Sequence, residues 1–336
     1  MTMGKLEEIA ELLKKRIDGG VYPPNVRLPS EYELADELGV NRITLNKAVN
    51  RLIADGYLRR GSSSRDGTYV RDRSELVKGT LGLLIRCGNL YADQLMHGVI
   101  DGALRNNYLL SVMAPELEEV RIAERKMLAN GIEGVFLASY ANFPLSAPGV
   151  LIDSFFDADP ERNTIISDVH SGGLQMAEAL LEKGHREIVV VMYSSFPFAR
   201  NPRCAAFLEA FRRAEIPDME ERFFYSNNRS REQLLKMIFS AFPDTTAIVG
   251  ENDTMTFELW QALRRLDPVR ADRITFAGFG NLPGVQSVFP FVTVDQHPYE
   301  LGCRAVQLYL NWRDDGRNRH ELVPVSVMNA DRIREV

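Results

Sequence analysis

Residues 28–58 read LPSEYELADELGVNRITLNKAVNRLIADGYL, and this stretch decides the fold of the first part of the chain. Ser30 and Glu33 have the spacing of a capping box, which predicts a short helix that ends at Gly39. Asn41 is expected to cap a second helix, in which the apolar residues form one stripe: Leu45, Val49 and Leu52. Two short helices joined at a glycine, the second with a polar and basic outer face, indicate a helix-turn-helix.

The flanking segments complete a small α+β domain. Apolar residues recur at helical spacing from Leu6 to Ile17, and Gly19 is expected to end this first helix. Two short strands are predicted at residues 57–60 and 68–70, joined by the flexible GSSSRDG. This hairpin is typical of the wing of a winged helix-turn-helix.

About 65 residues of this N-terminal part resemble the DNA-binding domain of the GntR family of bacterial transcription regulators. The resemblance rests on four spaced motifs: LPSE-x-x-LA, LGV-x-R-x-T, L-x-x-x-G and GT-x-V. It implies that the third helix enters the major groove with its first residues, that the wing tip reaches the minor groove, and that Arg42 and Thr44 contact base edges and phosphates. The full set of DNA contacts that it implies is Ser30, Tyr32, Asn41, Arg42, Thr44, Asn46, Lys47, Arg65 and Gly67.

Two positions depart from the family, since Tyr32 and Asn46 stand where arginine is common. Asparagine pairs bidentately with adenine whereas arginine prefers guanine, so we expect a different operator sequence. For Tyr32, packing, phosphate contact and base reading remain alternatives. The simplest alternative to DNA contact is that Arg42 and Lys47 only keep the exposed face of the helix soluble.

Charge is unevenly distributed along the chain. The 336 residues carry a net charge of −6, yet residues 40–73 hold eight Lys or Arg against three Asp. A basic stretch within an acidic protein is consistent with a small DNA-contacting surface.

Composition sets the broad class. The chain is 45% hydrophobic and 26% charged, as in ordinary globular proteins. No apolar run approaches the ~18 residues of a membrane span. The N-terminal segment carries charges where a signal peptide would be apolar, and the three cysteines have no CxxC spacing. We therefore expect a cytoplasmic location, reduced thiols and no structural metal.

Residues 73–79 are charged and lack periodicity, which predicts a linker between a domain at 1–72 and a second at 80–336. Beyond it, short apolar stretches alternate with amphipathic ones, as in βαβ units with parallel sheets. The pattern starts afresh near residue 189, which predicts two Rossmann-like α/β lobes with a ligand cleft between them. The predicted strands are 81–85, 109–113, 134–137, 189–192, 223–225, 247–249 and 274–277. The predicted helices are 93–105, 117–129, 203–214, 231–242 and 253–266.

Catalytic signatures are not found in this half. Neither GxxxxGK[ST] nor GxGxxG occurs, and the histidines lack metal-ligand spacing. The spacing of Asp153 and Asp168 does not favour a catalytic pair of carboxylates. His185 is expected to have a structural role. We expect no catalytic residue, no cofactor and no metal.

Nearly all of residues 80–330 resemble the effector domain of the LacI/GalR family, which is similar to periplasmic sugar-binding proteins. The segments that carry the resemblance are LLEKGHREIVVV, RCAAFLEAFRRA, AIVGENDTMTFELWQAL, ITFAGFGN and FVTVDQHPYELGCRAVQLYL. It implies that Asn252 faces the cleft, that Asp253 caps the next helix, and that Tyr91 stacks on a sugar. The implied ligand contacts are Tyr91, Asp153, Asp168, Arg203, Asn252, Asn281 and Gln296. Gly280 stands where the family often has an acidic residue, so the resemblance gives no firm sugar specificity.

The combination of the two domains resembles the arabinose-repressor group of Gram-positive bacteria. It implies a repressor of carbohydrate uptake or catabolism genes that is relieved by a bound sugar. It also implies a homodimer on a palindromic operator, without a membrane partner. Three alternatives stay open: an activator, a sensor of a non-sugar ligand such as a purine, and an enzyme gated by DNA binding. Purine recognition would favour aromatic sandwiching, for which Tyr91, Phe155, Phe156 and Phe198 are available.

Overall fold

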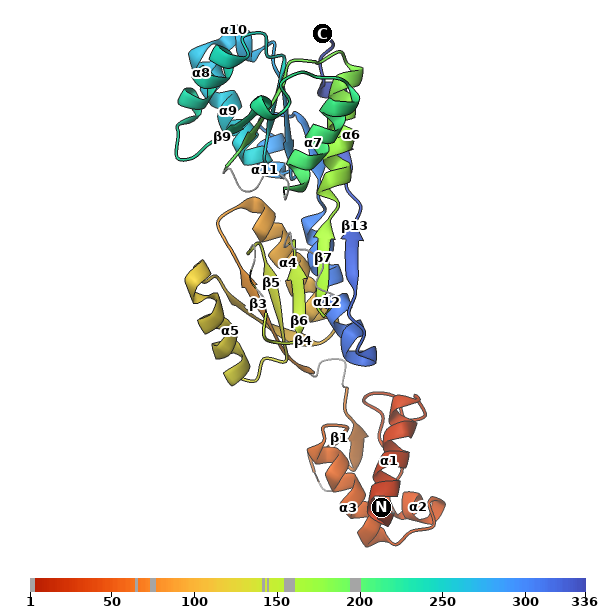
Figure 1. Cartoon of the computed structure of the whole chain (residues 1–336). Helices are drawn as coiled ribbons and strands as arrows, with labels where there is room; N and C mark the ends of the chain where they lie inside the picture. Colours follow the sequence, from red (N-terminus) through yellow and green to blue (C-terminus); the bar gives the residue numbers. More distant parts are fainter. Residues whose placement is uncertain are drawn as a thin grey trace. The chain divides into compact units, whose positions relative to one another are not determined.

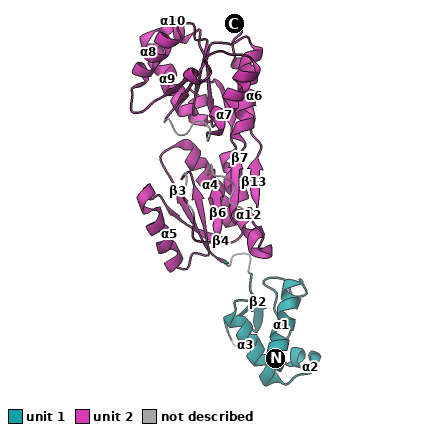
Figure 2. Cartoon of the chain, in the orientation of Figure 1, with its two compact units in different colours: residues 1–78 teal, residues 79–336 magenta. Residues whose placement is uncertain are grey.

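The computed structural model describes residues 4–63, 66–72, 77–140, 143, 145–153, 161–193 and 201–336. The chain divides into two compact units, residues 1–78 and residues 79–336 (Figure 2). The first strand of the second unit begins at Gly79, so the last residue of the predicted linker belongs to that strand.

In its described residues, the first unit contains three helices and a two-stranded antiparallel hairpin (Figure 1). Its elements are α1 (Lys5–Asp18), α2 (Glu31–Glu37), α3 (Arg42–Ala54), β1 (Leu58–Arg60) and β2 (Thr68–Val70). The capping box forms, because the Glu33 amide donates to Ser30 Oγ at 3.2 Å and the Ser30 amide donates to the Glu33 carboxylate at 2.8 Å. The predicted winged helix-turn-helix is confirmed.

The core of this unit fixes the orientation of α3. One face of the helix is buried against α1 and α2, which leaves the opposite face in solvent. The largest fully buried side chains of the unit are Leu13, Leu34, Leu45, Leu52 and Leu58.

The second unit consists of two lobes, each built on a six-stranded sheet covered by helices (Figure 1). The first lobe has the strand order β13-β7-β6-β5-β3-β4, and every neighbouring pair is parallel. Its strands are β3 (Gly79–Ile85), β4 (Tyr108–Met113), β5 (Gly134–Ala138), β6 (Gly149–Ile152), β7 (Asn163–Ser167) and β13 (His320–Val323). Its helices are α4 (Leu90–Arg105), α5 (Val120–Ala129) and α12 (Pro298–Asp315).

The second lobe has the order β14-β12-β11-β10-β8-β9, and only β14 runs antiparallel to its neighbour. Its strands are β8 (Ile188–Met192), β9 (Phe223–Tyr225), β10 (Ala247–Gly250), β11 (Thr275–Phe279), β12 (Val292–Asp295) and β14 (Ser326–Met328). Its helices are α6 (Val169–Glu182), α7 (Pro202–Arg213), α8 (Arg231–Ala241), α9 (Asp253–Leu266), α10 (Pro268–Ala271) and α11 (Pro283–Gln286). The two predicted α/β lobes with parallel sheets are confirmed.

The part of the chain that the structure describes passes between the lobes three times, from β7 to α6, from β12 to α12 and from β13 to β14. Two of these crossovers are tied together, since the Asp168 amide donates to the Val323 carbonyl at 2.8 Å. The lobes are therefore joined by a narrow set of neighbouring segments, a geometry suited to hinge motion.

Helices α4 and α12 pack at very short distance. A Cβ on Gly98 would lie 2.0 Å from the Tyr299 carbonyl oxygen, and one on Gly302 would lie 2.3 Å from that of Leu95. Neither position accommodates a side chain, so the two glycines allow the close helix contact. This contact holds α4, whose first residues line the pocket described below.

Helix boundaries differ from the sequence prediction mainly at caps. Helix α4 begins at Leu90 rather than at residue 93, because the Asn89 side chain accepts the Ala92 amide at 2.8 Å. The predicted helix at 117–129 is a short 3-10 turn, Leu117–Glu119, followed by α5. Among the described residues, no helix combines the length and apolar character needed to cross a bilayer.

Candidate functional site

The outer face of α3 presents polar and charged side chains to solvent. Arg42 and Lys47 are exposed, whereas Thr44 and Asn46 are partly buried. Asn41 is the N-cap, and its Oδ1 accepts both the Thr44 amide at 2.8 Å and the Thr44 hydroxyl at 2.9 Å. The Thr44 hydroxyl is thus engaged in the cap of its own helix.

Asn46 belongs to a polar network that joins α2, α3 and β1. Its Nδ2 donates to the two carboxylate oxygens of Glu31 at 3.0 and 2.9 Å, and its Oδ1 accepts from Asn50 at 2.9 Å. Arg60 donates to the same carboxylate at 2.9 Å and to Asn50 at 3.0 Å. Partial burial opposes the charged form of Glu31, but the hydrogen bonds from Asn46 and Arg60 outweigh it, so the pKa of Glu31 lies below its usual value.

The other predicted contacts surround this network. Ser30 caps α2, and Tyr32 on the same helix is 71% exposed. Gly67 has a φ of +83°, and a Cβ there would lie 2.6 Å from Arg27 Nε, so glycine allows the wing to approach that side chain. A hollow of about 330 Å³ between α2, α3 and the wing is lined in part by Arg27, Arg42 and Arg60. Arg65 lies outside the described residues.

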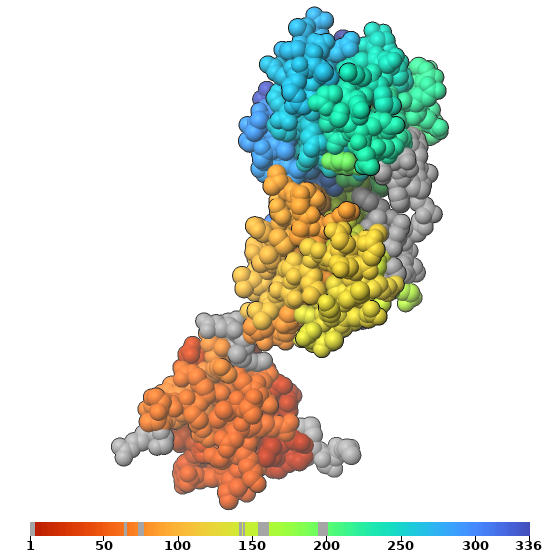
Figure 3. All heavy atoms as spheres, turned by 90° about the vertical axis from the view of Figure 1, so that its left-hand side faces the viewer, coloured from red at the N-terminus to blue at the C-terminus, as the bar shows by residue number. Residues whose placement is uncertain are grey.

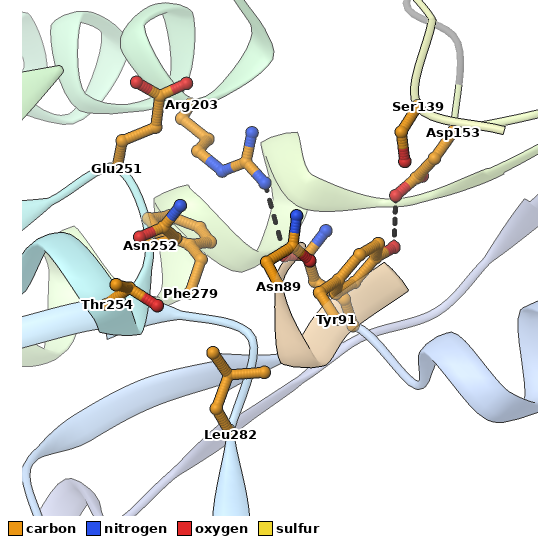
Figure 4. A pocket seen from close by; sticks show the side chains of 11 residues that line it. Asn89, Tyr91, Ser139, Asp153, Arg203, Glu251, Asn252, Thr254, Phe279 and Leu282 are labelled. Carbon is orange, nitrogen blue, oxygen red and sulfur yellow. Dashed lines mark hydrogen bonds between the residues drawn. The ribbon is translucent and has the colours of Figure 1, made fainter. Parts of the chain in front are cut away.

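A second hollow, of about 300 Å³, lies between the two lobes of the second unit (Figure 4). Among the described residues, eleven line it, and nine of these can form hydrogen bonds through their side chains. They are Asn89, Tyr91, Ser139, Asp153, Arg203, Glu251, Asn252, Thr254 and Gln296, and the two apolar members are Phe279 and Leu282. A small pocket that combines hydrogen-bonding side chains with apolar surface is suited to a small ligand that has both hydrogen-bonding groups and an apolar face.

On the first lobe, Asp153 organises the pocket wall. It is 9% exposed and follows β6 with a φ of +50°. Its carboxylate accepts the Ser167 amide at 3.0 Å, the Ser167 hydroxyl at 3.1 Å and the hydroxyl of Tyr91. Burial, and then the charge of Asp153, raise the pKa of Tyr91 well above its usual value, so this phenol stays protonated and donates.

On the second lobe, Arg203 and Gln296 form the opposite wall of the pocket. Arg203 lies at the start of α7, its guanidinium carbon is 5.0 Å from the centre of the Phe279 ring, and it donates to Gln296 Oε1 at 3.2 Å. Gln296 is 3% exposed and sits in the crossover between β12 and α12. This hydrogen bond therefore connects the ligand pocket to a crossover segment (Figure 4).

The expectation that Asp253 caps the following helix is wrong. Asn252 is the N-cap of α9 and accepts the Met255 amide at 2.9 Å, while it also lines the pocket. Asp253 is fully buried and accepts from the Leu282 amide at 2.9 Å and the Thr293 hydroxyl at 2.6 Å. A backbone N–H and a hydroxyl from distant segments satisfy this carboxylate, and no local pattern reveals them.

Asp168 and Asn281 lie outside the residues that line the pocket. Asp168 caps α6 by accepting the Ser171 amide at 3.0 Å. The Asn281 side chain donates to Asp295 at 2.9 Å. Phe155, Phe156 and Phe198, the aromatic residues considered for purine binding, lie outside the described residues.

The sequence analysis does not predict six of the residues that line the pocket: Asn89, Ser139, Glu251, Thr254, Phe279 and Leu282. Most follow the carboxyl ends of parallel strands, where ligands of α/β folds bind, and that rule would have singled them out once the strands were placed. Ser139 follows β5, Glu251 follows β10 and Phe279 ends β11.

Glu251 contributes negative charge to the second lobe, where its carboxylate accepts the Tyr193 amide at 2.6 Å. Burial, and then this charge, raise the pKa of the Cys204 thiol to about 12. The thiol next to the pocket therefore stays protonated and is not a nucleophile. Among the described residues, no group of three or more His, Cys, Asp or Glu side chains is arranged to hold a metal.

The two lobes touch at the edge of the pocket. A Cβ on Gly284, in α11, would lie 3.3 Å from Leu90 Cδ1, at the start of α4. Figure 3 shows the orange surface of the first lobe against the blue surface of the second.

Two family models match the chain. That of the gntR family of bacterial regulatory proteins matches residues 5–70, and that of the periplasmic binding protein-like domain matches residues 177–329. The chain joins a gntR-type helix-turn-helix domain to a periplasmic-binding-protein-like domain. This pairing is that of a transcription regulator.

A relative and two solved structures match large parts of the chain. The chain is 22% identical to the arabinose metabolism transcriptional repressor of Halalkalibacterium halodurans, over 91% of this chain and 88% of the relative. The fold is similar to that of the transcriptional regulator CelR in complex with cellobiose, with a TM-score of 0.67 at 15% identity, over 90% of this chain and 98% of that one. A LacI family regulator from Enterococcus faecium with bound ribose gives a TM-score of 0.63 at 19% identity, over 74% of this chain and 97% of that one.

Proposed function

We propose that this protein is a ligand-responsive repressor of carbohydrate uptake or catabolism genes, relieved when a sugar binds between the two lobes. The observation that carries the proposal is the pocket of about 300 Å³ with nine hydrogen-bonding side chains, in a chain that begins with a helix-turn-helix. Hydroxyl groups of a sugar match carboxylate, amide and guanidinium partners, and the apolar face of a sugar matches Phe279 or Tyr91. The pocket serves binding, not catalysis, and the protein works in the cytoplasm.

The lobes supply a mechanism for release. A ligand held by Asp153 on one lobe and Arg203 on the other favours a closed arrangement, which changes the crossover that contains Gln296. A coupling free energy of ~1–3 kcal/mol between sugar and operator gives roughly 5- to 150-fold regulation.

A homodimer on a palindromic operator is part of this proposal. Edge strand β4 and helix α4, which pack against each other, carry exposed apolar side chains on the same face of the sheet: Ile100, Leu104 and Val112. Such a patch fits a self-complementary interface. Leu104→Glu is expected to give a monomer in analytical ultracentrifugation and weaker operator binding. Leu117→Glu, on an exposed turn of the same lobe, serves as the control and is expected to remain dimeric.

The sugar is tested by thermal melting against pentoses, hexoses, uronic acids, sugar phosphates and purines. A ligand at ~100 times its dissociation constant stabilises the domain by about 2.7 kcal/mol. The shift is expected with one sugar and is expected to vanish in Arg203→Ala, but not in Arg265→Ala, which removes an exposed ion pair of the same lobe. A shift with a purine alone would replace the sugar by the second ligand class.

Regulation is tested on DNA selected by the full-length protein. The identified sugar is expected to weaken binding of this DNA in fluorescence anisotropy. Tighter binding with the sugar would instead indicate an activator or a corepressor mechanism. Turnover of the sugar during incubation, followed by chromatography, would revive the enzyme alternative.

A further inference from the structure

Ile43 interrupts the polar face of α3. It is the second residue of the helix and is 70% exposed. The core side of the helix is formed by other residues: Leu45, Ala48, Val49 and Leu52. Helical spacing places Ile43 beside Asn46 and Lys47, on the side where an amphipathic helix normally carries polar residues. A β-branched apolar side chain in solvent at this position gives nothing to the core.

A second large side chain is exposed nearby. Tyr32, on α2, is 71% exposed and lines a shallow hollow together with Asn41 and Arg42, the residues that begin α3. Tyr32 and Ile43 are among the most exposed large apolar or aromatic side chains of the described residues. The N-terminal end of the helix therefore offers apolar as well as cationic contact surface.

Asn46, by contrast, already has partners for both ends of its amide. Its Nδ2 donates to Glu31, and its Oδ1 accepts from Asn50. To pair with adenine through two hydrogen bonds, an asparagine side chain uses this same Nδ2 donor and this same Oδ1 acceptor. Reading adenine would separate Asn46 from a charged carboxylate that Arg60 also holds, so the network opposes the adenine-reading role that residue type alone indicates.

We propose that Ile43 is a specificity-determining residue of the DNA-binding domain and contacts the 5-methyl group of a thymine. This inference rests on the proposed function as a DNA-binding regulator. The first residues of a recognition helix contact base edges in the major groove. The thymine methyl is the apolar group that bases display there. The matching operator half-site contains a thymine whose methyl packs on Ile43, while Asn46 holds α2, α3 and the wing strand in register.

The test uses 2′-deoxyuridine, which pairs as thymine does but lacks the methyl group. The full-length chain selects its operator from random DNA, and each thymine of the selected site is then replaced singly by deoxyuridine. At one position in each half-site, affinity measured by fluorescence anisotropy is expected to fall about fourfold, the effect of one buried methyl-sized group. With Ile43→Ala this difference is expected to disappear, so that thymine and deoxyuridine bind alike.

Two control variants separate the alternatives. Val21→Ala changes an aliphatic side chain of the same domain that is 63% exposed but lies outside α2 and α3, and it is expected to leave the fourfold difference intact. Asn46→Ala is expected to weaken binding of all sequences without removing the thymine preference.

Three outcomes would overturn the proposal. The first is a selected operator without a deoxyuridine-sensitive position, and the second is a sensitivity that survives in Ile43→Ala. The third is a preference for thymine over deoxyuridine that disappears in Asn46→Ala but not in Ile43→Ala. In these three cases the chain still binds a specific DNA, so the proposed function stands. Failure to select any DNA would overturn both proposals, and melting curves of each variant verify that it is folded.

Discussion

The exposed face of α3 and the pocket between the lobes hold their polar groups in different ways. On α3, Arg42 and Lys47 extend into solvent. In the pocket, Asp153 and Gln296 are at most 9% exposed and accept hydrogen bonds from neighbouring side chains. A surface for DNA is usable without burial, whereas a pocket for a small ligand must be preorganised by internal partners. Substitutions of the exposed α3 side chains Arg42 and Lys47 should therefore change binding alone, and substitutions in the pocket should change binding and stability together.

The largest expected effect is that of Asp153→Ala. The substitution leaves the Ser167 amide and the Tyr91 hydroxyl without their buried acceptor, which costs about 3 kcal/mol in the free energy of unfolding. The melting temperature of the second unit should fall by roughly 6–12 °C, and the ligand-induced shift should be lost. Differential scanning calorimetry measures both. Asp153→Asn, which keeps one acceptor oxygen, should lose less, and equal losses for the two variants would show that the hydrogen bonds contribute little.

Arg42→Ala is the counterpart on the exposed surface. Loss of a base or phosphate contact by an arginine weakens DNA binding by roughly 10- to 100-fold, while the melting temperature of the first unit should stay the same. Fluorescence anisotropy with the selected operator measures the affinity. Arg51→Ala, on the same helix but paired with Asp55 and Glu7, is the control and should bind normally. A clear loss of stability in Arg42→Ala would contradict the separation of binding from folding on this face.

The same contrast explains what could be predicted from the sequence. The helix-turn-helix is specified by neighbours in the chain, because the capping residues Ser30 and Asn41 and the turn at Gly39 act within a few residues. The pocket is assembled from residues between 89 and 296, which meet only after both sheets have formed. Arg203, Asn252 and Gln296 were found through a family resemblance, and Asp153 proved to be tied to Tyr91 by a contact that spans 62 residues. Periodicity gives the strands, but it does not show which side chains meet at their ends.

Asn252 tests whether structural and ligand-binding roles in the pocket can be separated. Asn252→Ala removes the N-cap of α9 and should destabilise the second unit by about 1 kcal/mol. Asn252→Ser keeps a capping oxygen, so stability should change by only a few tenths of a kcal/mol, while the lost amide should still weaken the ligand. Isothermal titration with the identified ligand, together with melting curves, distinguishes these effects. Unchanged ligand affinity in both variants would make Asn252 a cap only.

The smallest expected effect is a difference between the two units in how their stability depends on pH. His185 is fully buried in the second unit, with Nδ1 2.8 Å from the Thr246 hydroxyl and Nε2 3.0 Å from the Arg334 carbonyl. Burial lowers the pKa of His185, so on acidification the unfolded chain takes up its proton first, near pH 6.5. The second unit should therefore lose stability as the pH falls from 7.5 to 5.5.

The first unit, residues 1–78, contains no histidine, and its stability should lack such a contribution over this range. Calorimetry at a series of pH values should show the transition of the second unit moving down with pH. In His185→Gln, whose amide can donate to the Arg334 carbonyl and accept from Thr246, that movement should shrink. An equal movement in wild type and variant would exclude His185 as its source.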